Sequence, residues 1–125
     1  MKSRESAENY LEAILILGRV KGNVHAIDIA AQLEFSKPSV SIAMKRLREQ
    51  GYIEVDSLGH ITLTPQGREI AERVYERHVF LSEWLTALGV DSLTAAEEAC
   101  RMGHVISAET FEAIRRFAAQ TDKGK

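Results

Sequence analysis

The sequence predicts a mainly α-helical protein, with an N-terminal winged helix-turn-helix followed by an α-helical dimerisation domain. Three observations carry this prediction. Residues 26–49 have the pattern of two short helices joined by a tight turn, residues 52–63 that of two short strands around a turn, and the rest that of amphipathic helices. We expect a first domain over residues 1–70 and a second over residues 71–125, with a long linker helix over about residues 65–88.

The first predicted helix, residues 6–17, carries apolar side chains such as Tyr10 and Ile14 at helical spacing, and a loop over residues 18–23 follows it. A short second helix, residues 27–33, is expected to bury one apolar face. That face consists of Ile27, Ala30, Ala31 and Leu33.

The next helix begins with a clear signal. The Ser36 hydroxyl is a typical N-cap, and Pro38 suits the first turn because its missing N–H has no helical partner there. Val40, Met44 and Leu47 form its buried stripe, which leaves a polar and basic face turned outward. This arrangement is typical of a helix that enters a DNA major groove.

Charge supports DNA binding locally rather than globally. The whole chain has a net charge of −2, but residues 36–48 carry two lysines and two arginines and no acid, a local charge of +4. Neutralisation of phosphates is the main sequence-independent source of affinity for DNA. The candidate contacts on this helix are Ser36, Lys37, Pro38, Ser39, Ser41, Ile42, Lys45, Arg46 and Arg48.

A wing of two strands, residues 52–55 and 60–63, follows this helix, with residues 57–59 as its turn. The tip has no Lys or Arg, so we expect Ser57 and His60 to contact phosphate rather than bases. Thr64 is expected to cap the linker helix, with Pro65 in its first turn.

The later helices expose too much apolar surface to be stable alone. Gly89 ends the linker helix, a further helix covers residues 93–106, and Ser107 caps the last one. A symmetric homodimer would bury this surface and would bind a pseudo-palindromic double-stranded operator. The candidate dimer contacts are Trp84, Leu85, Phe111, Ile114 and Phe117.

Composition excludes several classes of protein. A single cysteine rules out an intrachain disulfide, and the apolar run at residues 13–17 is too short for a membrane span, so we expect a cytoplasmic protein without a membrane partner. A small metalloenzyme would need an open coordination position and a base in a pocket, and the sequence supplies no convincing nucleophile or acid–base pair. A protein-binding winged helix remains a further alternative, which a steep salt dependence of binding to duplex DNA would exclude.

A family resemblance rests on three strings: SAENYLEAI near the start, ITLTPQGREIAERVYERHVFLSEWLTALGVD over the linker helix, and EEACRMGHVIS after it. Together with the helix-turn-helix, these resemble the metal-dependent repressors of the diphtheria-toxin-repressor and manganese-transport-regulator family. The motif E-A-C-x-x-x-H-V-x-S at Glu98 to Ser107 is the most specific part. The chain looks like the short form without the C-terminal SH3-like domain.

The resemblance implies a metal-responsive, DNA-binding transcriptional repressor that controls genes of iron or manganese homeostasis. The divalent ion would bind Glu12, His78, Cys100 and His104, with Asn9 as a weaker ligand. Thiolate in place of a carboxylate favours Fe²⁺ over Mn²⁺, with Co²⁺ and Zn²⁺ as alternatives. In this interpretation the metal joins the first helix to the dimerisation helices. The DNA-contacting helices of the two protomers are then held about one DNA turn (~34 Å) apart.

Three departures from the family pattern bear on this interpretation. Gly103 stands where the family has a glutamate ligand, and Asn9 offers only a neutral amide oxygen. Glu97, one turn before Cys100, is a candidate substitute ligand. Ile42 replaces a base-contacting Gln and is limited to meeting a thymine methyl. The alternative is therefore a metal-independent winged-helix regulator with a degenerate metal site.

Overall fold

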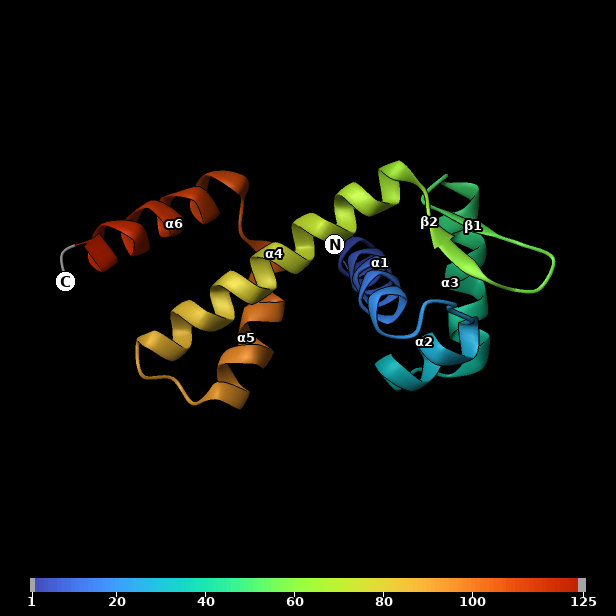
Figure 1. The fold of residues 1–125 in the computed structure, drawn as a ribbon, viewed down its shortest axis with the longest axis horizontal. Coiled ribbons are helices and arrows are strands. Elements are labelled where there is room, and N and C mark those ends of the chain that lie inside the picture. Colours follow the sequence, from blue (N-terminus) through green and yellow to red (C-terminus); the bar gives the residue numbers. More distant parts are fainter. Residues whose placement is uncertain (1, 124–125) are drawn as a thin grey trace. The chain divides into compact units, whose positions relative to one another are not determined.

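The computed structural model describes residues 2–123, with side chains from residue 6 to residue 120. Its elements are shown in Figure 1 in chain order. They are α1 (Lys2–Lys21), α2 (Ala26–Leu33), α3 (Lys37–Glu49), β1 (Ile53–Val55), β2 (Ile61–Leu63), α4 (Pro65–Ala87), α5 (Ser92–Val105) and α6 (Ala108–Lys123). The mainly α-helical class with an N-terminal winged helix-turn-helix is confirmed. The chain divides into two compact units, one up to Arg73 and one from Val74 on, so α4 begins in the first unit and continues in the second.

The first unit packs three helices and the small sheet around one apolar core. Leu11, Ile29, Val40 and Ile53 are almost fully buried there, one each from α1, α2, α3 and β1. Each of these elements contributes a side chain to the core, and α3 is fixed in place because its inner face is buried there. The opposite face of α3 stays in solvent.

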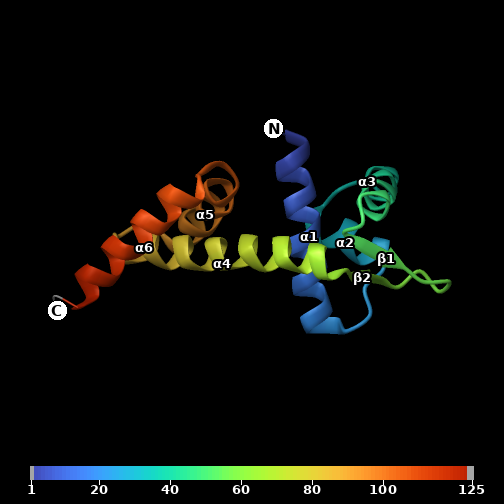
Figure 2. The same cartoon turned by 90° about the horizontal axis from the view of Figure 1, so that it is seen from above.

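The wing is an antiparallel pair in which Ile53 lies opposite Leu63 and Val55 opposite Ile61. Its loop extends beyond the helices of this unit (Figure 2). The Ile61 N–H donates to the Val24 carbonyl at 2.8 Å, which ties β2 to the segment between α1 and α2. At the start of α4, a Cβ on the buried Gly67 would collide with the Tyr52 carbonyl oxygen, so glycine allows α4 to begin directly against the base of the wing.

The second unit has its own small core, formed by Leu81 of α4, Ala99 of α5 and Phe111 of α6. These three buried side chains come one from each helix, so each helix of the unit depends on the other two. The partly buried hydrophobic side chains around them are Phe80, Trp84, Leu85, Met102, Ile106 and Ile114.

The predicted helix caps are confirmed by side-chain hydrogen bonds. Ser36 Oγ accepts the Ser39 N–H at 3.3 Å, Thr64 Oγ1 accepts the Gly67 N–H at 3.2 Å, and Ser107 Oγ accepts the Thr110 N–H at 3.0 Å. Two predictions are wrong. The expected loop over residues 18–23 begins too early, because α1 continues through Gly18 to Lys21. On α2, Ile27 and Ala31 are exposed, and the buried pair is Ile29 with Ala30.

Among the helices of the described residues, none combines the length and the apolar character needed to cross a membrane.

Candidate functional site

The exposed face of α3 is the candidate DNA interface. Val40, Met44 and Leu47 are buried, as predicted, and the side chains between them point away from the core. Ile42 is 58% exposed, although it is a large apolar residue on an otherwise polar face. The predicted contacts that lie exposed on or beside this helix are Ser36, Lys37, Pro38, Ser39, Ser41, Ile42, Lys45, Arg46 and Arg48.

The four cations of this helix have no acidic partner among the described residues. The ion pairs of the first unit join other side chains, such as Lys21 with Asp28 and Arg19 with Glu72. The positive charge of α3 is therefore not neutralised by any side chain that the structure describes, and it remains available to phosphate.

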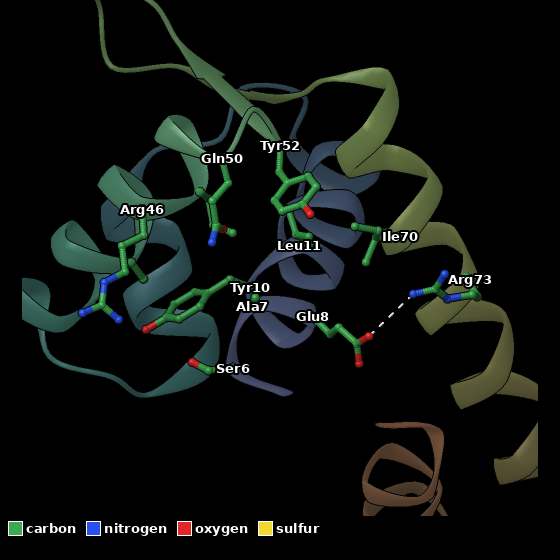
Figure 3. A pocket seen from close by; sticks show the side chains of 12 residues that line it. Ser6, Ala7, Glu8, Tyr10, Leu11, Arg46, Gln50, Tyr52, Ile70 and Arg73 are labelled. Carbon is green, nitrogen blue, oxygen red and sulfur yellow. Dashed lines mark ion pairs between the residues drawn. The ribbon is translucent and has the colours of Figure 1, made fainter. Parts of the chain in front are cut away.

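A pocket of about 430 Å³ opens beside α3, within the first unit (Figure 3). Tyr10 and Glu8 of α1 and Arg46 of α3 line it, together with Arg73 of α4. Glu8 is 6% exposed, and its Oε2 lies 3.6 Å from Arg73 Nη2, so this buried carboxylate is paired with a cation. Arg46 therefore lies on the flank of α3 that borders this pocket.

The base of the wing contains a histidine pair. The rings of His25 and His60 are T-shaped, with their centroids 4.8 Å apart. His60 Nδ1 lies 3.0 Å from Asp56 Oδ2, and Asp56 Oδ1 also accepts the N–H groups of Leu58 and His60. These hydrogen bonds, with the one from the His60 N–H foremost, hold the pKa of Asp56 below its ordinary value of 3.8. The wing residue His60 is thus engaged by Asp56, whereas Ser57 is exposed in the turn.

The candidate metal ligands of the second unit include one pair that the structure brings together. Cys100 and His104 lie one turn apart on α5, with Cys100 Sγ 3.9 Å from His104 Nε2, and both are half-buried. A thiolate and an imidazole on adjacent turns can bind one transition-metal ion.

His78 lies on α4, which packs against α5 in the core of the second unit. It precedes the buried Leu81 by three residues, and Cys100 directly follows the buried Ala99. Since Leu81 and Ala99 belong to one core cluster, α4 and α5 pack together within about one turn of His78 and Cys100. His78 is half-buried.

The other predicted ligands lie on α1 and near the middle of α5. Glu12, on α1 of the first unit, is 6% exposed, Asn9 is half-buried on the same helix, and Glu97 is exposed on α5. In the part of the chain that the structure describes, no three His, Cys, Asp or Glu side chains are grouped closely enough to hold an ion. The Cys100–His104 pair is therefore the part of the predicted site that is already assembled.

Gly103 is buried on α5 against α4. A Cβ built on it would lie 3.6 Å from the Arg77 Cβ, an ordinary van der Waals contact. Arg77 Nη1 donates to the Gly103 carbonyl at 3.1 Å and to the Ile106 carbonyl at 3.0 Å. The position where the family pattern has a glutamate thus faces an arginine of the neighbouring helix.

The candidate dimer contacts differ in their exposure. Phe111 is 7% exposed and packs edge-to-face on Phe80, whereas Phe117 is 64% exposed. Trp84, Leu85 and Ile114 are partly buried around the core of the second unit. Of these five, Phe117 offers the most surface to a partner.

Three features of the site were not predicted from the sequence: the His25–His60 pair, the Glu8–Arg73 ion pair and the contacts of Arg77. The first two join residues that are far apart along the chain. Arg77 is adjacent to the predicted ligand His78, but adjacency alone does not indicate which carbonyl groups its side chain contacts.

Comparison with protein families finds two matches that together cover nearly the whole chain. Residues 3–61 match the model described as the iron dependent repressor, N-terminal DNA binding domain. Residues 64–123 match the iron dependent repressor, metal binding and dimerisation domain.

Individual relatives agree with these matches. The transcriptional regulator MntR of Escherichia coli O6:H1 is 37% identical over 114 residues, which are 91% of this chain and 74% of that protein. An uncharacterized HTH-type transcriptional regulator of Methanocaldococcus jannaschii is 33% identical over 120 residues, covering 90% and 92% of the two chains. The structure of the manganese regulator SloR superposes with a TM-score of 0.81 at 25% identity, over 90% of this chain and 53% of that one. The chain thus spans about half the length of that solved structure.

Proposed function

Because the chain belongs to the iron dependent repressor family, a family of metal-responsive transcriptional repressors and not of enzymes, we propose that a divalent transition metal controls its binding to operator DNA. His78, Cys100 and His104 of the second unit are the proposed ligands, with Glu12 of the first unit as a fourth and Asn9 and Glu97 as weaker candidates. The outer face of α3 and the wing are the proposed DNA contacts.

The observation that carries the proposal is the Cys100–His104 pair on α5, with 3.9 Å between sulfur and nitrogen. Two potential ligands that already share a helix face lose little conformational freedom when an ion binds. The donors also fit such an ion, since one thiolate and two imidazoles suit borderline and soft dications. The metal would supply positive charge and a fixed coordination geometry to this set.

The donor set favours Fe²⁺ among the candidate ions. Mn²⁺ prefers carboxylate and carbonyl oxygen, and this chain has Cys100 and Gly103 at two family ligand positions, neither of which has a side-chain oxygen. Glu12 is then the one carboxylate among the four main ligands. Co²⁺ and Zn²⁺ suit the same donors and are useful probes of the site.

On the DNA side, we propose a homodimer that binds a pseudo-palindromic operator in the cytoplasm. The cations of α3 support a dimer. Residues 36–48 carry a charge of +4, so two copies of this helix can neutralise twice as many phosphates as a monomer can. Phe117, the most exposed of the candidate dimer contacts, is the side chain with most surface to bury on association.

A cobalt titration of the apo protein tests the ligand set. Cys100 is the only cysteine, so any thiolate-to-Co²⁺ charge-transfer band reports on this residue alone. We expect the band in the unaltered protein, its loss in Cys100→Ser, and weaker Co²⁺ binding in His104→Ala and Glu12→Gln. His60→Ala is the matched control, because it removes a half-buried histidine that lies outside the ligand set.

An operator selected from random duplexes in the presence of Fe²⁺ under reducing conditions then tests the function. Coupling between two binding sites is typically about 1–3 kcal/mol, so we expect Fe²⁺ to raise operator affinity roughly 5- to 150-fold. Cys100→Ser should remove this increase while the dimer stays intact. Equal operator affinity with and without metal would contradict the proposal and would indicate a metal-independent regulator.

A further inference from the structure

We infer that Arg77 is a positioning residue of the metal centre: it fixes the last turn of α5, and with it His104, through two hydrogen bonds to the backbone of that helix end. The inference rests on the proposed function, since it concerns an ion bound by Cys100 and His104. It assigns a role to a side chain that is not itself a ligand.

The last carbonyl groups of an α-helix have no N–H partner within the helix. The Arg77 guanidinium supplies one from α4, because Nη1 donates to the Gly103 carbonyl at 3.1 Å and to the Ile106 carbonyl just beyond the helix at 3.0 Å. A cation at this end also interacts favourably with the helix dipole.

The Arg77 guanidinium is also held by an aromatic ring. Its central carbon lies 5.2 Å from the centre of the Phe111 ring, and Phe111 is 7% exposed in the core of the second unit. Phe111 in turn packs edge-to-face on Phe80 of α4. The arginine therefore contacts α5 through hydrogen bonds and α6 through a cation–π contact, so it is fixed by all three helices of its unit.

Arg77 and the carbonyl that it binds are both next to proposed ligands in the sequence. Arg77 directly precedes His78 on α4, and the Gly103 carbonyl that it binds directly precedes His104 on α5. Cys100 lies one turn further from the helix end. Fraying of the last turn would therefore move His104 first and leave Cys100 in place, so loss of Arg77 should weaken metal binding through the imidazole.

The test compares Arg77→Gln and Arg77→Lys with Arg115→Gln. Arg115 is the matched control because its guanidinium also lies over Phe111, at 5.9 Å, but it pairs with Glu76 and makes no hydrogen bond to α5. Loss of a side chain that orients metal ligands typically lowers affinity roughly 10- to 100-fold. We expect a decrease of this size for Co²⁺ in Arg77→Gln, a smaller one in Arg77→Lys, and none in Arg115→Gln. At saturating Co²⁺ the Cys100 charge-transfer band should persist in all three.

A second measurement on the apo protein separates this role from a general loss of stability. The Ile106 N–H donates to the Met102 carbonyl at 3.0 Å in the last turn of α5. Its hydrogen exchange should become faster in Arg77→Gln, while amides in the first turn of α5 exchange as before. Should Arg77→Gln fail to fold, Arg77→Lys serves both measurements.

The outcomes are distinguishable. A Co²⁺ affinity of Arg77→Gln within twofold of that of the unaltered protein, or unchanged exchange at Ile106, would overturn the inference while leaving the ligand set standing. Absence of the charge-transfer band from the unaltered protein would overturn the ligand set and the inference with it.

Discussion

Replacing Gly103 by alanine tests whether the fold requires a glycine at this point of α5. Glycine in a helix interior is less favourable than alanine by about 1 kcal/mol. The added Cβ would lie 3.6 Å from the Arg77 Cβ, an ordinary contact that needs no displacement of either helix. Gly103 lies in the last turn of α5, so we expect Gly103→Ala to raise the free energy of unfolding by up to about 1 kcal/mol, which chemical denaturation of the apo protein can measure.

The control for this prediction is Gly67→Ala, because that glycine is also buried but its added Cβ would collide with the Tyr52 carbonyl. Gly67→Ala should destabilise the protein, because this collision outweighs any gain in helix propensity in the first turn of α4. If Gly103→Ala is destabilising as well, then α4 and α5 approach each other too closely for a side chain, and the reasoning about this position is refuted.

If alanine is accepted, Gly103→Glu supplies the carboxylate that the family pattern has at this position. A carboxylate oxygen favours Mn²⁺ more than the existing thiolate does. We expect Mn²⁺ affinity at least about tenfold higher than in Gly103→Gln, a difference of about 1.4 kcal/mol, by equilibrium titration. The glutamine variant has the same size without the charge, so equal affinities of the two variants would show that the side chain does not reach the ion.

Two further predictions concern the DNA-binding unit. Replacing a single thymine of the selected operator by uracil removes only a methyl group. Where Ile42 contacts that methyl group, we expect the binding free energy to weaken by about 0.8 kcal/mol, or about fourfold in affinity, as measured by fluorescence anisotropy. The loss should vanish in Ile42→Ala, and an operator in which no thymine is sensitive would exclude this contact. The depressed pKa of Asp56 means that its carboxylate stabilises the fold above pH 3.8 and that this contribution is lost as the pH falls below that value. Asp56→Ala should therefore be less stable than the unaltered protein at pH 7, and the difference, measured by urea denaturation, should shrink toward pH 3; a constant difference would contradict this account.

Local chemistry explains why the starts of α3, α4 and α6 were predictable. Ser36, Thr64 and Ser107 each bond an N–H group three residues later, and such contacts depend on a few neighbouring residues only. The buried stripe of α3 was predictable for a similar reason, since three residues at helical spacing define one face over thirteen residues.

The errors arise where the local signals were ambiguous. The loop was predicted to begin at Gly18, but α1 ends only at the next glycine, because Gly22 has a φ of 91° and its N–H donates to the Gly18 carbonyl at 3.0 Å. On α2, eight residues make little more than two turns, so the sequence was compatible with more than one apolar face. The structure buries Ile29 and exposes Ile27.

Contacts between distant segments do not follow from local sequence patterns, and Gly103 is an example that matters for function. From the sequence alone, Gly103 is a missing carboxylate and a flexible point in a helix, which favours a degenerate metal site. In the structure its carbonyl group is bound by Arg77, 26 residues earlier, and a charged side chain therefore stabilises the turn that carries His104. The loss of one potential ligand thus does not imply that the turn has lost its order. The response to metal then depends on Cys100 and His104, the proposed ligands that remain on α5, and on the Arg77 contact that fixes the end of this helix. Substitutions of Cys100 and Arg77 therefore test the metal response more directly than substitutions of Gly103 do.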